Sequence, residues 1–522
     1  MKTPRRIGRA SALAITFGAG LSALLLSRGP AAADDADSNA ARTQPTTETV
    51  VAAARNPNRV AFRPAFVLDA HAPSGPVNNI YGGPEVDQNA GVATDGAGHW
   101  VAVWHSSDKV GGRSGHDYDI LLARSSDNGL TWTQPVALNT NAANDVGDDL
   151  EPVVRTDETG VWIVTWDSDE TFGGKYGLDR DIFFARSTDN GESWSAPAPL
   201  NLNADKDWGK DNEPRLAADG RGNWVAVWAS TDSLGNRIGG DSDILVAHST
   251  DKGETWTHPV ALNNNAAADK GFDSSPDIIT DASGRWLAAW SAGDSGLQGI
   301  GNDRDILIAH SDDNGGTWSD PAPLNSSATS DANSDWTPRL ASDGRGHWVA
   351  VWSSADSLGD TIGVDRDILV SRSTDNGDTW STARALNRNA ATDAAEDSAP
   401  AIVSDGLGNW VVAWHAWGDL GYSDGSDADI AVAYSADDGV TWTDPTHIND
   451  RAAGDAVDDL LPALATDGRG HIVAVWQSFN PPDANVKDSE WRILAAGTSI
   501  SATGTAPPPS AASPGASDKP VP

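Results

Sequence analysis

The stretch STDNGDTW (373–380) occurs six times in this 522-residue chain, with small variations. The copies begin at residues 125, 187, 249, 311, 373 and 435, so successive copies lie 62 residues apart. A fixed period of this length is the sequence signature of a repeat protein, in which each copy forms one supersecondary unit. The repeat, rather than the total length, therefore decides the number and kind of structural units.

A second repeated segment ends in tryptophan, as in NWVAVW (223–228) and HWVAVW (347–352). Its last Trp falls at positions 104, 166, 228, 290, 352, 414 and 476, which gives seven units. Side chains alternate between the two faces of a strand, so the two Trp residues and the Ala between them share one face. Val occupies the other face, and we therefore expect a strand that is buried on both sides.

Each unit contains four strand-like runs separated by turns rich in Gly, Asn and Asp. In the fifth unit these runs are PRLASD (338–343), the Trp strand, DRDILVSRS (365–373) and a run that begins at Trp380. Four short antiparallel strands in a repeat of about 40 to 60 residues predict one blade of a β-propeller. We therefore predict an all-β fold, a seven-bladed propeller of four-stranded antiparallel blades over residues 59–500.

The seventh unit lacks its fourth run. Residues 59–77, which include RVAFRPAFVL (59–68), precede the first unit and are available to supply the missing strand. An N-terminal strand in the last blade would close the ring and remove sheet edges. The sequence does not fix which part of 59–77 forms that strand.

The two ends of the chain differ from the repeats. Residues 1–33 combine a basic start, an apolar run over 10–26 and small residues at 31–33, which is typical of a cleaved export signal. Arg5 and Arg6 leave a twin-arginine signal open beside the general export route. We expect cleavage near Ala33, a flexible segment over 34–58 and a disordered Pro/Ala/Ser-rich tail over 501–522. The mature chain is expected to be a secreted or periplasmic monomer without a membrane span.

The chain contains no cysteine and has a net charge of −38. The absence of cysteine excludes disulfides, thiol catalysis and thiolate metal sites, so packing and ring closure must hold the fold together. The negative charge disfavours nucleic acids and anionic membranes as partners. It suits a cation-rich medium, and a solvated acidic surface that keeps an exported protein soluble explains it equally well.

The repeated octet follows the pattern Ser-x-Asp-x-Gly-x-Thr/Ser-Trp. This pattern resembles the Asp box, or BNR repeat, of the sialidase superfamily, and the resemblance implies a propeller with its boxes on the face opposite the active site. Turn chemistry predicts that each box carboxylate braces the turn between the third and fourth strands, because it accepts hydrogen bonds from turn amides and hydroxyls. The box carboxylates are Asp127, Asp189, Asp251, Asp313, Asp375 and Asp437.

Two further columns of aspartates recur in the loops expected on the opposite face. Carboxylates two residues apart suit Ca²⁺, which prefers oxygen ligands. Turn formation and protection of strand ends explain the same residues without a metal. One column consists of Asp87, Asp149, Asp211, Asp273, Asp335, Asp397 and Asp459, and the other of the pairs Asp117/Asp119, Asp179/Asp181, Asp241/Asp243, Asp303/Asp305, Asp365/Asp367 and Asp427/Asp429.

The units differ most beside the proline of the first strand. First strands line the central channel of a propeller, and units two to five carry charge there, whereas units six, seven and one are small or apolar. This lopsided distribution indicates a ligand pocket, although ion pairs such as Glu213–Arg215 that fill the channel would also explain it. The charged residues are Glu151, Arg155, Glu213, Arg215, Asp277 and Arg339.

The resemblance to sialidases also implies a catalytic hypothesis. Such an enzyme needs an arginine cluster for the substrate carboxylate, an acid/base Asp, and a Tyr nucleophile activated by Glu. The residues that fit binding are Arg155, Arg215, Arg339 and Glu151, and those that fit catalysis are Asp277, Tyr422 and Glu213. The Phe-Arg-Ile-Pro signature of the family is absent, however, and the length of the complete units does not vary.

Enzymes usually embellish one or two loops of a repeat scaffold to build a pocket. The strict period therefore favours a binding protein over an enzyme. We expect a secreted Asp-box propeller that binds a carbohydrate, or another extracellular ligand such as a protein, at the face opposite the boxes. Ca²⁺ stays open as a cofactor, and an exo-α-sialidase type of glycoside hydrolase is the alternative.

Overall fold

A computed structural model describes residues 61–68, 86–107, 117–142, 146–268, 270–281, 283–293, 303–324, 328, 333–363, 365–387, 390–392, 396–417, 427–448, 457–479 and 491–499. The predicted export signal (1–33), the segment 34–58 and the tail 501–522 lie outside this described part. Within it, no helix is long and apolar enough to cross a membrane.

Seven four-stranded antiparallel sheets account for the strands, and six of them follow the chain order without crossovers. The first blade contains β2 (Asp87–Thr94), β3 (Trp100–Ser106), β4 (Asp119–Ser125) and β5 (Val136–Ala137). The second contains β6 (Asp149–Thr156), β7 (Trp162–Ser168), β8 (Asp181–Ser187) and β9 (Ala198–Pro199). The third contains β10 (Asp211–Ala218), β11 (Trp224–Ser230), β12 (Asp243–Ser249) and β13 (Val260–Ala261).

The next three blades repeat this plan. The fourth contains β14 (Asp273–Thr280), β15 (Trp286–Gly293), β16 (Arg304–Ser311) and β17 (Ala322–Pro323). The fifth contains β18 (Asp335–Ser342), β19 (Trp348–Ser354), β20 (Asp367–Ser373) and β21 (Arg384–Ala385). The sixth contains β22 (Asp397–Ser404), β23 (Trp410–Trp417), β24 (Ala428–Ser435) and β25 (Thr446–His447). The fourth strands are only two residues long, shorter than the runs expected from the sequence.

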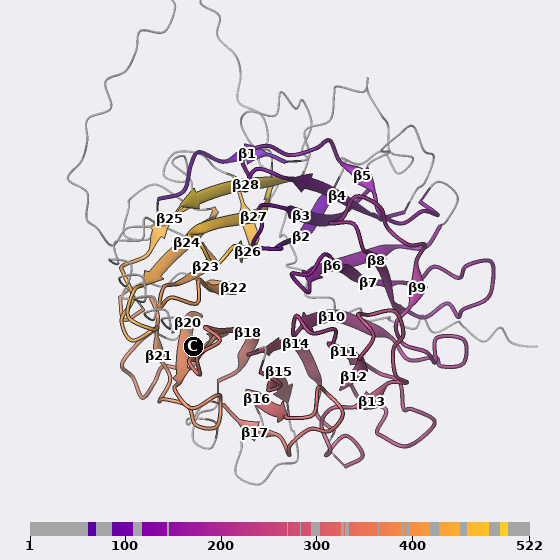
Figure 1. The fold of residues 1–522 in the computed structure, drawn as a ribbon. Coiled ribbons are helices and arrows are strands. Elements are labelled where there is room, and N and C mark those ends of the chain that lie inside the picture. Colours follow the sequence, from indigo (N-terminus) through magenta and orange to yellow (C-terminus); the bar gives the residue numbers. More distant parts are fainter. Residues whose placement is uncertain are drawn as a thin grey trace, which may run out of the picture. The chain divides into compact units, whose positions relative to one another are not determined.

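The seventh blade combines both ends of the repeat region. Its strands are β26 (Asp459–Thr466), β27 (His471–Phe479), β28 (Trp491–Ser499) and β1 (Phe66–Val67). Strand β1 is antiparallel to β28, with Phe66 opposite Ala495 and Val67 opposite Leu494. Each first strand contacts the first strand of the next blade, and β26 contacts β2, so the sheets form a closed ring (Figure 1). The predicted seven-bladed propeller and its closure by an N-terminal strand are confirmed.

The Trp strands are the second strands of the blades and form the contacts between neighbouring blades. Trp100 and Trp104 are fully buried and belong to one cluster with Val473 and Val475 of the seventh blade. The opposite face of the same strand packs against the second blade. A buried Trp covers about 150–250 Å². Because each second strand packs its Trp face on one neighbouring blade and its Val face on the other, both faces recur in the sequence every 62 residues.

The strand register places the Asp boxes and the varied loops at opposite ends of the blades. In the first blade, Thr94 pairs with Trp100, and Trp100 pairs with Ser125, where the Asp box begins. At the other end, Ser106 pairs with both Asp87 and Asp119. We call the Asp-box end the lower face. The upper face carries the loops between second and third strands and the links between blades.

Candidate functional site

The box of the second blade shows what the repeated octet does. Ser187 Oγ donates to Asp189 Oδ1 at 2.7 Å, and the amide of Ser193 donates to the same oxygen at 2.9 Å. The Ser193 hydroxyl donates to Asp189 Oδ2 at 2.5 Å. These hydrogen bonds lower the pKa of Asp189 to about 2, and the bond from the Ser193 hydroxyl contributes most. The carboxylate is held as an anion by its own turn, and this chemistry braces the turn.

The residue before the first-strand proline position is distorted in all seven blades. Each of these residues lies in a β-bulge of the innermost strand, and each has φ between 49° and 56°. A left-handed conformation costs a non-glycine residue about 1–3 kcal/mol, and bulges re-aim side chains beside functional sites. The seven residues are Asn89, Glu151, Glu213, Ser275, Thr337, Ala399 and Leu461.

Charged side chains gather around these bulges in the second to fifth blades. The electrostatic interactions among these groups link residues of β6, β7, β10, β14 and β18 and the loop before β8. We call this set the charged arc, and it consists of Glu151, Arg155, Asp167, Arg180, Glu213, Arg215, Asp277 and Arg339. The structure thus brings six of the sequence-predicted site residues together. Tyr422, the predicted nucleophile, lies outside the described residues.

Three guanidinium groups of the charged arc form no close ion pair with any described carboxylate. Nη1 of Arg155, Arg215 and Arg339 donates to a carbonyl of its own strand, at 2.9, 2.8 and 2.7 Å respectively. None of the three forms an ion pair within 4.0 Å in the described part of the chain, so the alternative of a Glu213–Arg215 pair is not found there. Burial and the neighbouring Arg215 lower the pKa of Arg339 to about 10, which leaves it charged at neutral pH.

Two carboxylates of the arc are fixed by the next blade. Asp277 Oδ2 accepts a hydrogen bond from the amide of Leu340 at 2.8 Å. Glu213 Oε2 accepts one from the amide of Ser275 at 2.5 Å. Both predicted catalytic carboxylates are therefore oriented by backbone donors of the neighbouring first strand.

Glu151 has a different environment, because no hydrogen bond to its carboxylate is found among the described residues. Burial, and then the charge of Glu213, raise the pKa of Glu151 to about 7. Burial also raises the pKa of Asp167, although Arg180 forms an ion pair with it at 2.6 Å. The arc therefore contains a carboxyl group that gains and loses its proton near neutral pH.

The sequence analysis missed Asp167 and Arg180 and their neighbour His105. Asp167 and His105 occupy equivalent places, directly after the second Trp of a Trp strand, where the units carry His, Asp, Ala, Ser, Ser, His and Gln. Nδ1 of His105 accepts the amide of Glu151 at 3.4 Å, so this column contacts the bulge of the next blade. Burial and then Arg180 lower the pKa of His105 to about 3, which keeps the ring neutral. The residue type at this position differs among the seven units, and that variation is the sequence signal by which these residues could have been predicted.

The two acidic columns connect strands at the upper end of each blade. Asp149 Oδ1 accepts a hydrogen bond from Trp166 Nε1 at 2.9 Å. Nδ2 of Asn201 bridges Asp181 Oδ1 and Asp211 Oδ2, at 2.7 and 2.8 Å. Asn139 and Asn263 make the same bridge in their blades. Much of each column therefore contributes to blade structure.

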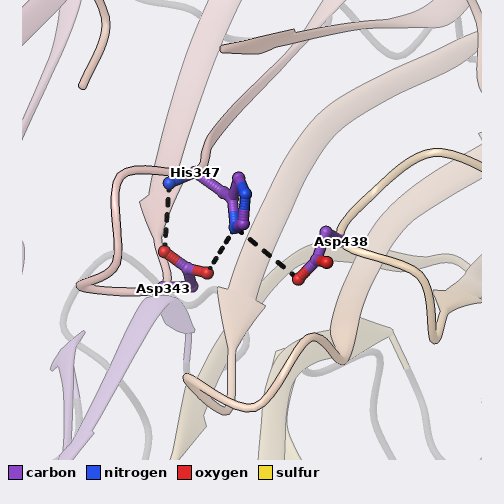
Figure 2. Close-up of side chains that lie close together, drawn as sticks. All are labelled: Asp343, His347 and Asp438. Carbon is purple, nitrogen blue, oxygen red and sulfur yellow. Dashed lines mark hydrogen bonds and ion pairs between the residues drawn. The ribbon is translucent and has the colours of Figure 1, made fainter. Parts of the chain in front are cut away.

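One further cluster of potential metal ligands lies on the lower face (Figure 2). Nδ1 of His347 lies 2.7 Å from Asp343 Oδ2 and 3.7 Å from Asp438 Oδ1. The same contact, at 2.6 Å, braces the corresponding turns of the first and seventh blades, between His99 and Asp95 and between His471 and Asp467. Turn bracing therefore explains this cluster without a metal.

Ring closure and six braced octets define the class of protein, a seven-bladed β-propeller with Asp boxes. No protein-family profile matches this chain, and no curated protein matches it.

Solved structures give distant similarities in fold. A Dyadobacter fermentans protein of unknown function is 15% identical, with 85% of this chain and 99% of that chain covered and a TM-score of 0.47. The NanB sialidase of Streptococcus pneumoniae is 12% identical, with 84% and 71% covered and a TM-score of 0.43. An α-L-arabinanase of Penicillium chrysogenum is 14% identical, with 67% and 93% covered and a TM-score of 0.41.

Proposed function

We propose that this protein is an exported propeller that binds a carboxylate-bearing saccharide at the charged arc. The observation that carries the proposal is the group formed by Arg155, Arg215 and Arg339. These half-buried guanidinium groups lie close enough to affect one another's pKa, and none has an ion-pair partner among the described residues. Three guanidinium groups held this close to one another favour the binding of an anion.

The chemistry of the arc fits an acidic sugar better than a simple anion. A guanidinium group presents a planar fork that binds a carboxylate through two parallel hydrogen bonds. In each of the three arginines only Nη1 donates to a described residue, so the other N–H groups are available to a ligand. Oxygens of Glu151 and Glu213 supply acceptors for sugar hydroxyls. Trp208, which is 85% exposed on the upper face, offers an aromatic surface for a sugar ring.

A glycan array tests this proposal directly. We expect the purified protein to bind glycans that end in sialic or uronic acids and to leave neutral glycans unbound. Arg215→Ala should weaken binding about 100-fold, because a hydrogen-bonded charge contributes about 1.5–3 kcal/mol. Arg221→Ala, which removes an exposed arginine of the lower face, is the matched control. Equal binding of neutral and acidic glycans, or full binding by Arg215→Ala, would overturn the proposal.

Hydrolysis of a sialoside is the second candidate function. It is favoured by Glu151, whose pKa of about 7 suits proton transfer near neutral pH. The assignment of Asp277, Tyr422 and Glu213 to catalysis stays a prediction. We expect the binding function alone, so a fluorogenic sialoside should not be turned over. Turnover that is lost in Arg215→Ala and Glu151→Gln but kept in Arg221→Ala would establish the enzyme instead.

A further inference from the structure

A second cluster of charge lies between the second and third blades, apart from the charged arc. Carboxylate oxygens of Asp179, Asp181 and Asp207 lie within 4.8 Å of one another. Nδ2 of Asn203 donates to Asp207 Oδ2 at 2.5 Å and to Asp232 Oδ2 at 2.7 Å. We call these five residues the link cluster. Its members come from the loop before β8, β8 itself, the link before β10 and the loop after β11.

Four oxygens of the link cluster have no hydrogen-bond donor among the described residues. Both carboxylate oxygens of Asp179, Oδ1 of Asp207 and Oδ1 of Asn203 are shut off from solvent and accept no hydrogen bond from any described residue. Folded proteins leave few buried acceptors in this state, because each has given up its hydrogen bonds to water. Four such oxygens at one place have the acceptor capacity to bind a cation.

No described basic residue neutralises the link cluster. Arg180, which lies between Asp179 and Asp181 in the sequence, turns to Asp167 in the charged arc. Lys206 pairs with Asp205, and its side chain is 78% exposed.

Two glycines allow the oxygens to come together. A Cβ atom on Gly177 would lie 2.0 Å from Asp179 Oδ1, and one on Gly209 would lie 2.3 Å from the Cα atom of Asp232. The chain therefore packs a carboxylate against one glycine and a loop backbone against the other. Any larger residue would displace Asp179 or separate Asp232 from the link that carries Asp207.

We propose that the link cluster is a Ca²⁺ site that joins the second and third blades. All its ligand atoms are carboxylate or amide oxygens, which is the donor set of a hard cation. Ca²⁺ accepts six to eight oxygens in flexible geometry, whereas Mg²⁺ requires a tighter octahedron and retains water. The link cluster contains no histidine or cysteine, so it does not suit Zn²⁺. This site is independent of the saccharide proposed above.

Calorimetric titration of the chelator-treated full chain with Ca²⁺ alone tests the site. The variants Asp179→Asn and Asp207→Asn should each bind one Ca²⁺ fewer per chain than the wild type. Asp205→Asn removes the same charge from an exposed residue of the same link and should bind as the wild type does. Mg²⁺ should bind at least about 10-fold more weakly. Absence of Ca²⁺ binding in the wild type, or an unchanged number of sites in both variants, would overturn the proposal.

Thermal unfolding separates a metal site from a purely structural cluster. In chelator, Asp207→Asn should melt at or above the wild-type temperature, because the substitution relieves repulsion among buried carboxylates. With Ca²⁺ at 100 times its Kd, the wild type should gain about 3 °C in Tm, and the variant should gain less. If Asp207→Asn instead lowers Tm equally with and without Ca²⁺, the cluster is structural and the proposal is wrong.

Discussion

The Asp boxes of the lower face and the charged arc, which lies along the first strands, treat carboxylates in opposite ways. Asp189 is exposed, yet hydrogen bonds from its own turn hold its pKa at about 2. Glu151 is half-buried, and burial with the nearby charge of Glu213 holds its pKa at about 7. A carboxylate that accepts several hydrogen bonds within its own turn stabilises the fold. A carboxylate that is buried beside another carboxylate lowers the stability of the folded protein. A role in ligand binding or in proton transfer would account for such a residue.

The comparison predicts that substitution of an Asp-box glycine, Gly253, has the largest effect on stability. A Cβ atom on Gly253 would lie 2.1 Å from Ile163 Cδ1 of the preceding blade, and its φ is +72°. Gly377 has the same kind of φ, +83°, but its nearest neighbour, Leu287, would be 3.7 Å away. Gly253→Ala should cost about 3 kcal/mol in unfolding free energy, and Gly377→Ala only about 1 kcal/mol, since it strains the backbone without a clash. Guanidinium denaturation measures the unfolding free energy of both variants. Equal losses of stability would mean that the close packing of the box glycine on the preceding blade does not contribute.

Glu151→Gln is expected to stabilise the protein. The pKa of Glu151 is raised from an ordinary value of 4.5 to about 7, so the folded state binds more protons between these values and stability falls as pH rises. At pH 8 the variant should exceed the wild type by roughly 2 kcal/mol, and the gain should vanish below about pH 4.5. Glu254→Gln, on the exposed lower face, is the control for loss of charge. A destabilised Glu151→Gln at pH 8 would contradict the electrostatic difference between the two faces.

Asp189→Asn should destabilise the protein, and by less than Glu151→Gln stabilises it. A depressed pKa gives stability that is present above about pH 3.8 and is lost as pH falls towards 2. Because Asp189 is exposed, the loss at pH 7 should be about 1 kcal/mol. Denaturation at pH 7 and at pH 2.5 measures the difference between the variant and the wild type. If that difference does not shrink in acid, the ionised carboxylate is not what braces the turn.

Trp208→Ala should have the smallest effect on stability. The Trp208 side chain is 85% exposed, so its removal should change the unfolding free energy by less than about 0.5 kcal/mol. The same change should weaken saccharide binding about 10-fold if the indole ring stacks on the sugar. Titration with the best ligand from the glycan array measures this loss. Unchanged affinity would confine the binding site to the charged arc.

The sequence predicted the architecture well, because the features that build it recur in register. The Trp strands fixed the number of blades, and the incomplete seventh unit predicted closure by an N-terminal segment. Only the length of the fourth strands was wrong. The boxes recur with their hydroxyl partners two residues before and four residues after each Asp, so local chemistry was enough to predict the bracing of the turn.

The site was predicted only in part. Glu151 and Glu213 stood out because the units disagree there, but their bulge was not foreseeable, since non-glycine residues seldom adopt positive φ. Arg180, in the loop before β8, was missed because its direction depends on Asp167 of β7. In the link cluster, Asp207 and Asp232 meet only through the juxtaposition of two blades. No spacing along the chain encodes such a contact.

Strand β1 has a kinetic consequence. Phe66 and Val67 pair with Leu494 and Ala495, which lie at the opposite end of the repeat region. The nascent chain must therefore keep its first strand unpaired until the repeat region has been translated. Once paired, these two residues connect the N-terminal segment to the seventh blade and close the ring. Unfolding of the ring must then either separate this strand pair or open an interface between two blades. Separation of this short junction is therefore one of the two routes by which the folded ring can open.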